Sequence, residues 1–393
     1  VSSKNLALGL ADMPADFVSA YVLGSVGTSG PSLGACATFF YNLRQAVNEI
    51  RSGKIRVAVV GVAESAVDPN IIDGYYTMGA LASDADLLKL DADKGLSEPD
   101  HRRASRPFSS NCGFTVSESS QFIVLFDDDL AMELGAQIHG SVPDVFVNAD
   151  GYKKSISSPG VGNYLTVAKA LAAAAGIIGD KAIKHRSFVQ SHGTSTPQNR
   201  VSESHILNEV AKTFGIEKWP VAAIKAYIGH SIGAASGDQL IASLGVWNDN
   251  IIPGISTIDH IADDVHSSNL RLQKEHLEVE PDSLDVAVLN AKGFGGNNAS
   301  ATLLSPTLSK KLLQGRHGDK AWQSYLGRQE QSRDRAAAYD NKASETGFNV
   351  LYKFGENVLG GEDLNMSRDG IGIKGWAEKV DLNMESPFAQ WLK

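Results

Sequence analysis

A single cysteine between small residues, at the start of a predicted helix, constrains this chain most. Residues 34–38 read Gly-Ala-Cys-Ala-Thr, and apolar residues at helical spacing follow as far as Gly53. We expect Cys36 at a strand-to-helix turn, where the helix dipole and the free amides of the first turn favour a thiolate. Cys36 is therefore a candidate nucleophile, expected to alkylate faster than Cys112. Taken alone, such a cysteine is more often a buried small hydrophobe, so the interpretation depends on residues far downstream.

Composition excludes several classes of function. The chain has 393 residues, 42% of them hydrophobic, which is enough for a large core. A formal charge of −9 argues against nucleic acid as a partner, and no apolar run is long enough to span a bilayer. Two cysteines form neither a disulfide framework nor a zinc spacing, so we expect no metal and a reducing, cytoplasmic location.

Helical and strand patterns alternate along the chain and predict an α/β fold. Helices are expected at 5–23, 163–176 and from Gly233 to about Trp247. Strands are expected at 55–60 (fully buried), 122–126, 188–190, from Val221, at 285–289 and at 300–304. The acidic stretch 82–106 is interpreted as a solvated loop, because its Asp91-Ala-Asp93 lacks the glycine and glutamate of a calcium loop. The polar region from 307 includes a predicted charged helix at about 318–343.

A faint internal repeat indicates two related α/β halves. The segment 32–37 (Ser-Leu-Gly-Ala-Cys-Ala) matches 231–236 (Ser-Ile-Gly-Ala-Ala-Ser), and a Gly-Phe pair precedes an apolar strand in both halves. Far less sequence precedes the first match than the second, so we expect residues 1–306 to need further sequence ahead of Val1 for a complete fold. The predicted boundaries are 1–130 for the end of the first half, 131–306 for the second half and 307–393 for a polar extension.

Two histidines follow apolar strands, where a loop has room for a substrate. His192 lies in Ser-His-Gly-Thr-Ser-Thr-Pro, and His230 lies in Gly-His-Ser-Ile-Gly. Either histidine alone could equally cap a helix or satisfy a buried carbonyl. Lys225 adds a positive charge to the second loop, and the turn 293–298 (Gly-Phe-Gly-Gly-Asn-Asn) offers unobstructed backbone N–H groups that suit an oxyanion. An ordinary hairpin is the alternative for that turn.

These four motifs, in this order, resemble the β-ketoacyl-acyl-carrier-protein synthases, the condensing enzymes of fatty acid synthesis. The resemblance covers about residues 15–306. It implies the thiolase fold, a five-layered α-β-α-β-α arrangement of two pseudo-equivalent halves, the first incomplete here, usually assembled as a homodimer. It also implies decarboxylative Claisen condensation of an acyl thioester with malonyl-acyl-carrier protein. No cofactor is implied, because the phosphopantetheine arrives on the carrier protein.

The resemblance also assigns roles to residues. Cys36 resembles the nucleophile that accepts the acyl group. His192 and His230 match the pair that assists decarboxylation and stabilises the enolate, and Lys225 matches the lysine that supports this pair. Phe294 resembles the gating phenylalanine, whose N–H forms the oxyanion hole with that of Cys36. The expected substrate-binding residues are Thr194, Thr196, Phe114, Gly295 and Gly296.

Some positions depart from the family pattern and suggest a divergent branch. Arg200 stands where the family usually has Asp, Gln239 replaces a glutamate and Asn297 replaces a threonine. A degradative thiolase would need a second catalytic cysteine late in the chain, which Cys112 does not provide. Two alternatives stay open: a ketosynthase of a polyketide or polyunsaturated fatty acid synthase, and a non-catalytic partner subunit, against which Cys36 argues.

Overall fold

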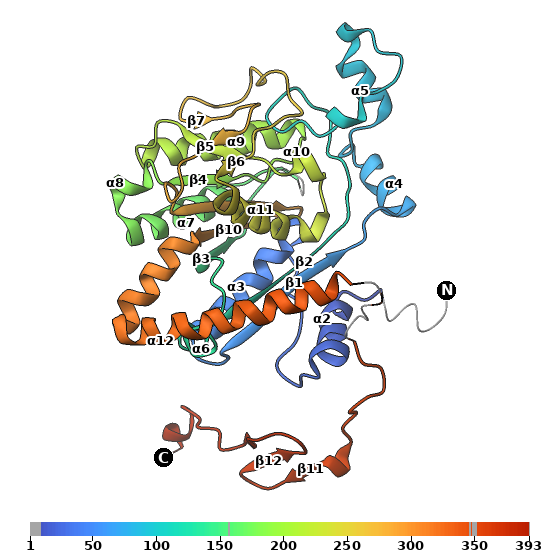
Figure 1. Cartoon of the computed structure of the whole chain (residues 1–393). Helices are drawn as coiled ribbons and strands as arrows, with labels where there is room; N and C mark the ends of the chain where they lie inside the picture. Colours follow the sequence, from blue (N-terminus) through green and yellow to red (C-terminus); the bar gives the residue numbers. More distant parts are fainter. Residues whose placement is uncertain (1–8, 156–157, 346, 348–351, 393) are drawn as a thin grey trace. The chain divides into compact units, whose positions relative to one another are not determined.

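The computed structural model describes residues 9–155, 158–345, 347 and 352–392 (Figure 1). The chain divides into two compact units, one of residues 1–15 and 30–346 and the other of residues 16–29 and 347–393. The predicted helix at 5–23 is shorter than expected: α2 spans Met13–Phe17, a π-helix spans Val18–Leu23, and positions 5–8 lie outside the described residues.

A six-stranded mixed sheet forms the centre of the larger unit, in the order β3-β10-β9-β4-β5-β7 (Figure 1). Its strands β4 and β9 are buried over all or most of their length, as expected for a sheet between two helical layers. Strand β9 pairs antiparallel with β10 and parallel with β4, so the strands predicted at 285–289 and 300–304 are paired on either side of the Gly-rich turn. The strands are β3 (Ser141–Asn148), β4 (Ser187–Gln190), β5 (Trp219–Ala222), β7 (Leu270–Arg271), β9 (Val286–Gly293) and β10 (Asn297–Leu304).

Helices cover both faces of this sheet. On one face α7 (Gly162–Ile178) and α9 (Pro197–Thr213) pack Leu171 and Leu207 against the strand residues Val189 and Val288. On the other face α3 (Thr38–Arg51) and α11 (Ala235–Asp249) contribute their apolar sides to a second core. The helical spacing after Cys36 predicted this burial of α3, because Phe40, Leu43 and Val47 recur on one face.

A two-stranded antiparallel sheet packs on the far side of α3 and α11, so the described residues build four layers, α-β-α-β. Its strands are β1 (Val57–Glu64) and β2 (Ser119–Phe126). The expectation of a fully buried strand at 55–60 is wrong, because Val57 and Val59 point outward and are 45% and 42% exposed.

The internal repeat is visible in the backbone. Short 3-10 turns, Ala35–Ala37 before α3 and Ile232–Ala234 before α11, each begin with a non-glycine residue at φ 50°. The two turns are equivalent with a shift of two residues from the sequence match, so Cys36 corresponds to Gly233 rather than to Ala235. Residues 24–34 form a loop, and the strand expected directly before Cys36 is not found there.

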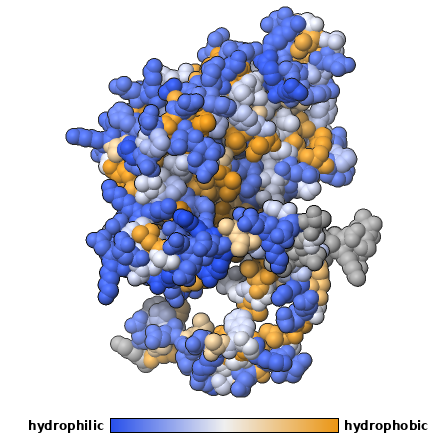
Figure 2. Space-filling view, viewed as in Figure 1, coloured by the Kyte–Doolittle hydropathy of each residue, from blue (hydrophilic) through white to orange (hydrophobic). Residues whose placement is uncertain are grey.

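The acidic stretch 82–106 is ordered, so its interpretation as a solvated loop is wrong. It contains α5 (Asp84–Leu90) and two 3-10 turns, Ala92–Lys94 and His101–Arg103. Asp91 is 4% exposed and receives both guanidinium nitrogens of Arg106. The surface over α5 is mostly hydrophilic on the face drawn in Figure 2, as expected from the acidic composition of the segment. The composition alone does not predict that Asp91 and Arg106 are buried as a pair.

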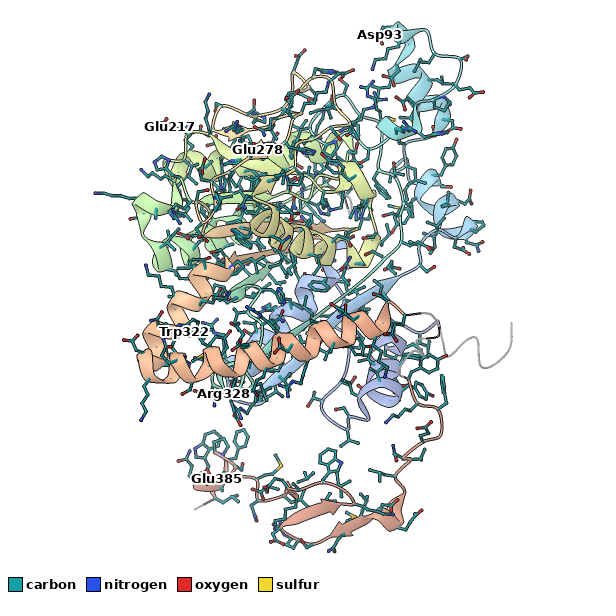
Figure 3. All side chains as sticks on the ribbon, in the orientation of Figure 1. Asp93, Glu217, Glu278, Trp322, Arg328 and Glu385 are labelled. Atoms are coloured by element: carbon teal, nitrogen blue, oxygen red, sulfur yellow. The ribbon has the colours of Figure 1, made fainter. Side chains whose placement is uncertain are left out.

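The polar region after residue 306 begins as part of the larger unit. Helix α12 (Pro306–Ala343) is interrupted at Gly318, and its second part confirms the predicted charged helix. Trp322, marked in Figure 3, packs with Tyr325 of α12 and with Met132 of α6 (Asp128–Leu134). The boundaries at 130 and 306 stay predictions. None of the described helices is long and apolar enough to cross a membrane.

The smaller unit contains a three-stranded antiparallel sheet in the order β11-β12-β13. Its elements are β11 (Leu364–Met366), β12 (Gly370–Ile373), β13 (Val380–Asp381) and the 3-10 turns Gly361–Asp363 and Ala389–Trp391. The remaining elements of the larger unit are α4 (Pro69–Thr77), α8 (Asp180–Ile183), α10 (Lys225–Ile228), β6 (Ile251–Ile252) and β8 (Leu277–Glu278).

Candidate active site

The sulfur of Cys36 is enclosed at the turn before α3. The side chain is 4% exposed, and the backbone N–H groups of Cys36 and Phe294 both face Sγ. Burial raises the pKa of the thiol to about 11, although the Lys225 charge and the two N–H groups act in the opposite direction. The expected resting thiolate is therefore wrong: desolvation of the charged form outweighs the helix N-terminus and the nearby cation.

A close backbone contact brings the Phe294 turn against Cys36. A side chain at Gly293 would place its Cβ 2.2 Å from the carbonyl oxygen of Gly34, so glycine alone fits there. The next two glycines of the turn have φ of 89° and 88°, a region that favours glycine. Asn297 closes the turn: its Nδ2 donates to the Phe294 oxygen at 2.7 Å, and its Oδ1 accepts from the Tyr41 hydroxyl at 3.0 Å.

The two predicted histidines meet beside the thiol. Their ring centroids are 5.6 Å apart and the rings are perpendicular. The Ile232 N–H donates to His230 Nδ1 at 3.1 Å, which assigns the proton to Nε2 and makes Nε2 a donor. His192 Nδ1 is buried and has no partner among the described residues. Burial and the Lys225 charge hold the pKa of both histidines well below the usual range, so both are neutral at neutral pH.

A buried carboxylate holds the loop that carries His192. Glu203, on α9, is 0% exposed and accepts from the backbone N–H groups of His192 at 2.7 Å and Gly193 at 2.8 Å. The amides of Asn199 and Asn290 donate to the same carboxylate at 2.8 and 2.7 Å. Lys225 Nζ lies 2.6 Å from the His192 carbonyl oxygen and fixes the loop from the other side.

The departures from the family pattern have local explanations. Gln239 Nε2 donates to the carbonyl oxygens of Ser191 at 2.6 Å and Asn290 at 2.8 Å, which an ionised glutamate could not do. Arg200 pairs with Asp264 through two contacts of 2.8 Å and lines no part of the cavity described next. Gln239 and Arg200 therefore hold residues around the site and do not themselves line the cavity.

One cavity of about 100 Å³ collects most of the predicted residues. Its lining includes Cys36, Phe114, His192, Thr194, Thr196, His230, Phe294 and Gly296. Lys225 and Gly295 do not line it. The cavity is smaller than the roughly 300–1,000 Å³ of ligand pockets, so an acyl chain requires side-chain movement here. Phe294 lines the cavity and stacks on Tyr75 outside the lining, with ring centroids 6.4 Å apart, so movement of Phe294 is one way to enlarge the cavity.

Several residues of the site were missed in the sequence. Tyr75 contacts both Phe114 and Phe294. A polar arm of the same cavity is lined by Asp150, Lys153 and Lys292. Lys292 had a detectable signal, since it is a charged residue near the end of an otherwise apolar strand, β9. Asp150 and Lys153 follow β3 in a loop with no distinctive pattern.

Comparison with known families identifies the family of the chain that contains this cavity. Residues 7–130 match the model of the β-ketoacyl synthase N-terminal domain, and residues 139–259 match that of the C-terminal domain. The chain belongs to the β-ketoacyl synthase family. The two matched ranges contain the Cys36 turn and both histidine loops, so the candidate nucleophile and the histidines lie in different family domains.

Individual relatives agree with this assignment. The chain is 49% identical over 392 residues to the β-ketoacyl-[acyl-carrier-protein] synthase FabY of Pseudomonas aeruginosa, which covers 100% of this chain and 61% of FabY. It is 28% identical over 279 residues to 3-oxoacyl-[acyl-carrier-protein] synthase 2 of Vibrio cholerae, which covers 70% of this chain and 62% of that protein. The chain thus spans about three fifths of the length of these relatives.

Solved structures confirm the fold. The crystal structure of the noncanonical ketosynthase FabY from Pseudomonas aeruginosa superposes with a TM-score of 0.95 over 100% of this chain and 61% of that chain. A type II polyketide ketosynthase in complex with its acyl-carrier protein superposes with a TM-score of 0.65 at 18% identity, over 78% of this chain and 69% of that chain. The predicted α/β thiolase fold is therefore confirmed, whereas the roles of individual residues stay predictions.

Proposed function

We propose that this chain is a 3-oxoacyl-acyl-carrier-protein synthase that condenses an acyl thioester with malonyl-acyl-carrier protein. One observation carries the proposal: a thiol, two neutral imidazoles and two convergent backbone N–H groups share a single cavity. Acyl transfer needs the thiol and the N–H groups, and stabilisation of an enolate needs neutral donors. No group in this scheme requires a metal or a soluble cofactor.

In the first half-reaction Cys36 Sγ attacks the carbonyl carbon of the acyl thioester. The N–H groups of Cys36 and Phe294 receive the oxyanion that develops on the carbonyl oxygen. The bond to the phosphopantetheine sulfur then breaks, and the proton of Cys36 ends on that departing thiol. Because the resting thiol has a pKa of about 11, it must lose its proton during the attack rather than beforehand.

In the second half-reaction the carbon–carbon bond to the malonyl carboxylate breaks and carbon dioxide leaves. The electron pair enters the thioester as an enolate, whose oxygen accepts a hydrogen bond from His230 Nε2–H. His192, 5.6 Å from His230 between ring centroids, is the second donor. The enolate carbon attacks the acyl-Cys36 carbonyl, and the C–S bond breaks to leave the 3-oxoacyl product on the carrier. Cys36 departs as a thiolate and takes up one proton from solvent, which restores the thiol.

The carrier-protein partner belongs to the proposal because both FabY and the type II polyketide ketosynthase are described with acyl-carrier protein. Thr194 and Thr196, with hydroxyls 3.1 Å apart at the cavity wall, are the proposed contacts of the pantetheine arm. A polyketide ketosynthase is the second candidate, favoured by the same fold match. A homodimer and a cytoplasmic location stay predictions from the sequence.

The test separates the two half-reactions in this chain. Cys36→Ala should abolish acylation and condensation while malonyl decarboxylation persists. His230→Ala should lower decarboxylation roughly a hundred- to a thousandfold, the usual cost of one preorganised donor, and leave Cys36 acylation intact. Release of labelled carbon dioxide and trapping of acyl-enzyme measure these outcomes on the same folded samples. Wild-type decarboxylation by the His230 variant would contradict its role.

A further inference from the structure

Lys292 places an ammonium group in the polar arm of the cavity without a carboxylate partner. Its Nζ lies 3.2 Å from Ser202 Oγ and 3.4 Å from Asn199 Oδ1, both on the first turns of α9. Among the described residues no Asp or Glu oxygen lies within 4.0 Å of this nitrogen. Two neutral acceptors hold the ammonium in position and leave it without a direct ion-pair partner.

The two nearest carboxylates are already occupied. Both oxygens of Glu203 accept two hydrogen bonds each, from the His192 loop and from two asparagines. Asp150 accepts from the Asn298 amide at 2.8 Å and pairs with Lys153 at 3.3 Å. The cavity therefore contains one lysine that is ion-paired, Lys153, and one that is not, Lys292.

An unpaired ammonium in such a place is costly to the free protein. Burial lowers the pKa of Lys292, which the charges of Glu203 and Asp150 offset in part. A half-buried cation of this kind is stabilised when an anion with matching hydrogen-bond acceptors enters the site. The ammonium lines the same cavity as the thiol and both imidazoles, so the anion it fits is one attached close to the reacting carbon.

We propose that Lys292 binds the free carboxylate of the malonyl thioester and so distinguishes the malonyl donor from uncharged acyl thioesters. This inference rests on the proposed function, which supplies the malonyl substrate. Of the two substrates in that reaction, only the malonyl group carries an anion near its thioester carbonyl. Ser202 and Asn199 hold Nζ so that at least one N–H remains for the incoming carboxylate.

The direction of the effect follows from where charge moves. During decarboxylation negative charge leaves the carboxylate and appears on the enolate oxygen near His230, while the leaving carbon dioxide is neutral. An ammonium at the carboxylate therefore stabilises the bound substrate more than the transition state. Lys292 should lower KM for the malonyl donor without raising kcat. Because carbon dioxide is neutral, the Lys292 ammonium should not retain it after the carbon–carbon bond breaks.

The experiment measures labelled carbon dioxide release from malonyl-carrier protein by the whole 393-residue chain. Lys292→Met should raise KM roughly tenfold to a hundredfold, the range for one hydrogen bond to a charged group, with kcat unchanged or slightly higher. Lys292→Arg, which keeps the charge, should recover part of the affinity. Lys212→Met is the control, since Lys212 is an exposed lysine of α9 that does not line the cavity, and KM should change less than twofold.

Two further readouts keep the test decisive. Cys36 acylation by an uncharged acyl thioester should proceed at the wild-type rate in Lys292→Met, and the variant should unfold at the wild-type temperature or higher, because a cation without a direct ion-pair partner has been removed. An unchanged malonyl KM in Lys292→Met, or an equal loss in both half-reactions, overturns the role of Lys292. Absence of decarboxylation in the wild-type chain and in every variant would instead contradict the proposed function.

Discussion

Glu203→Gln is the substitution that tests most directly how the His192 loop is held. Each carboxylate oxygen of Glu203 accepts two hydrogen bonds. In glutamine one of these oxygens becomes an NH₂ group, which cannot accept a hydrogen bond from either of the two donors that face it. Whichever way the amide turns, one backbone N–H, of His192 or of Gly193, and one asparagine amide lose their acceptor. The shape of the side chain is unchanged, so packing contributes little to the result.

The expected magnitude follows from those contacts. A hydrogen bond to a charged group contributes about 1.5–3 kcal/mol, so two lost bonds lower the free energy of unfolding by about 3–6 kcal/mol. For a chain of this size that corresponds to a fall in melting temperature on the order of 10 °C. Decarboxylation should fall more than acylation, because His192 sits on the released loop and Cys36 lies on a different turn.

Thermal and urea unfolding followed by circular dichroism, together with both half-reaction assays, measure these effects. Glu217→Gln is the control: Glu217 is exposed at the surface, where Figure 3 marks it, and its substitution should change stability by less than about 0.5 kcal/mol. A Glu203→Gln variant within 1 kcal/mol of the wild-type stability, with unchanged decarboxylation, would refute the reasoning, since the buried donors would then have found other partners.

Two more predictions concern charge. Because the pKa of Cys36 is about 11, its alkylation by iodoacetamide should rise close to tenfold per pH unit between pH 7 and pH 10, as mass spectrometry of its peptide would show; a plateau below pH 8 would contradict the buried thiol. Asp91→Asn should make residues 82–106 far more sensitive to limited proteolysis, whereas substitution of the exposed Glu98 by Gln should not. The Arg106 hydrogen bond holds the pKa of Asp91 below its usual range, so this stabilisation is present above the unfolded-state pKa of about 4 and is lost as pH falls through the lowered pKa. Protease sensitivity of the wild type that does not rise as the pH is lowered below about 4 would argue against it.

The elements that surround the site could be predicted from local pattern. Helix α3, the hairpin of β9 and β10 and the short strand β4 all have the periodicity that their burial requires. The order of the four motifs placed Cys36, His192, His230 and Phe294 in one site, and these residues line one cavity. Such signals are readable because helix and strand spacing depends on neighbours a few residues apart.

The protonation states of the site residues and the pairing of charged groups depend on contacts between distant parts of the chain. The thiol of Cys36 is neutral because burial removes water from it, and part of that burial comes from Gly293 of β9, whose backbone packs against the Cys36 turn. The segment 82–106 is ordered because Asp91 meets Arg106 across a turn. Lys292 faces the cavity without an ion-pair partner because the carboxylate oxygens of Glu203 and Asp150 accept hydrogen bonds from other donors. Spacing along the sequence determines which residues share a face, whereas desolvation and pairing are set by everything that packs around a group in three dimensions.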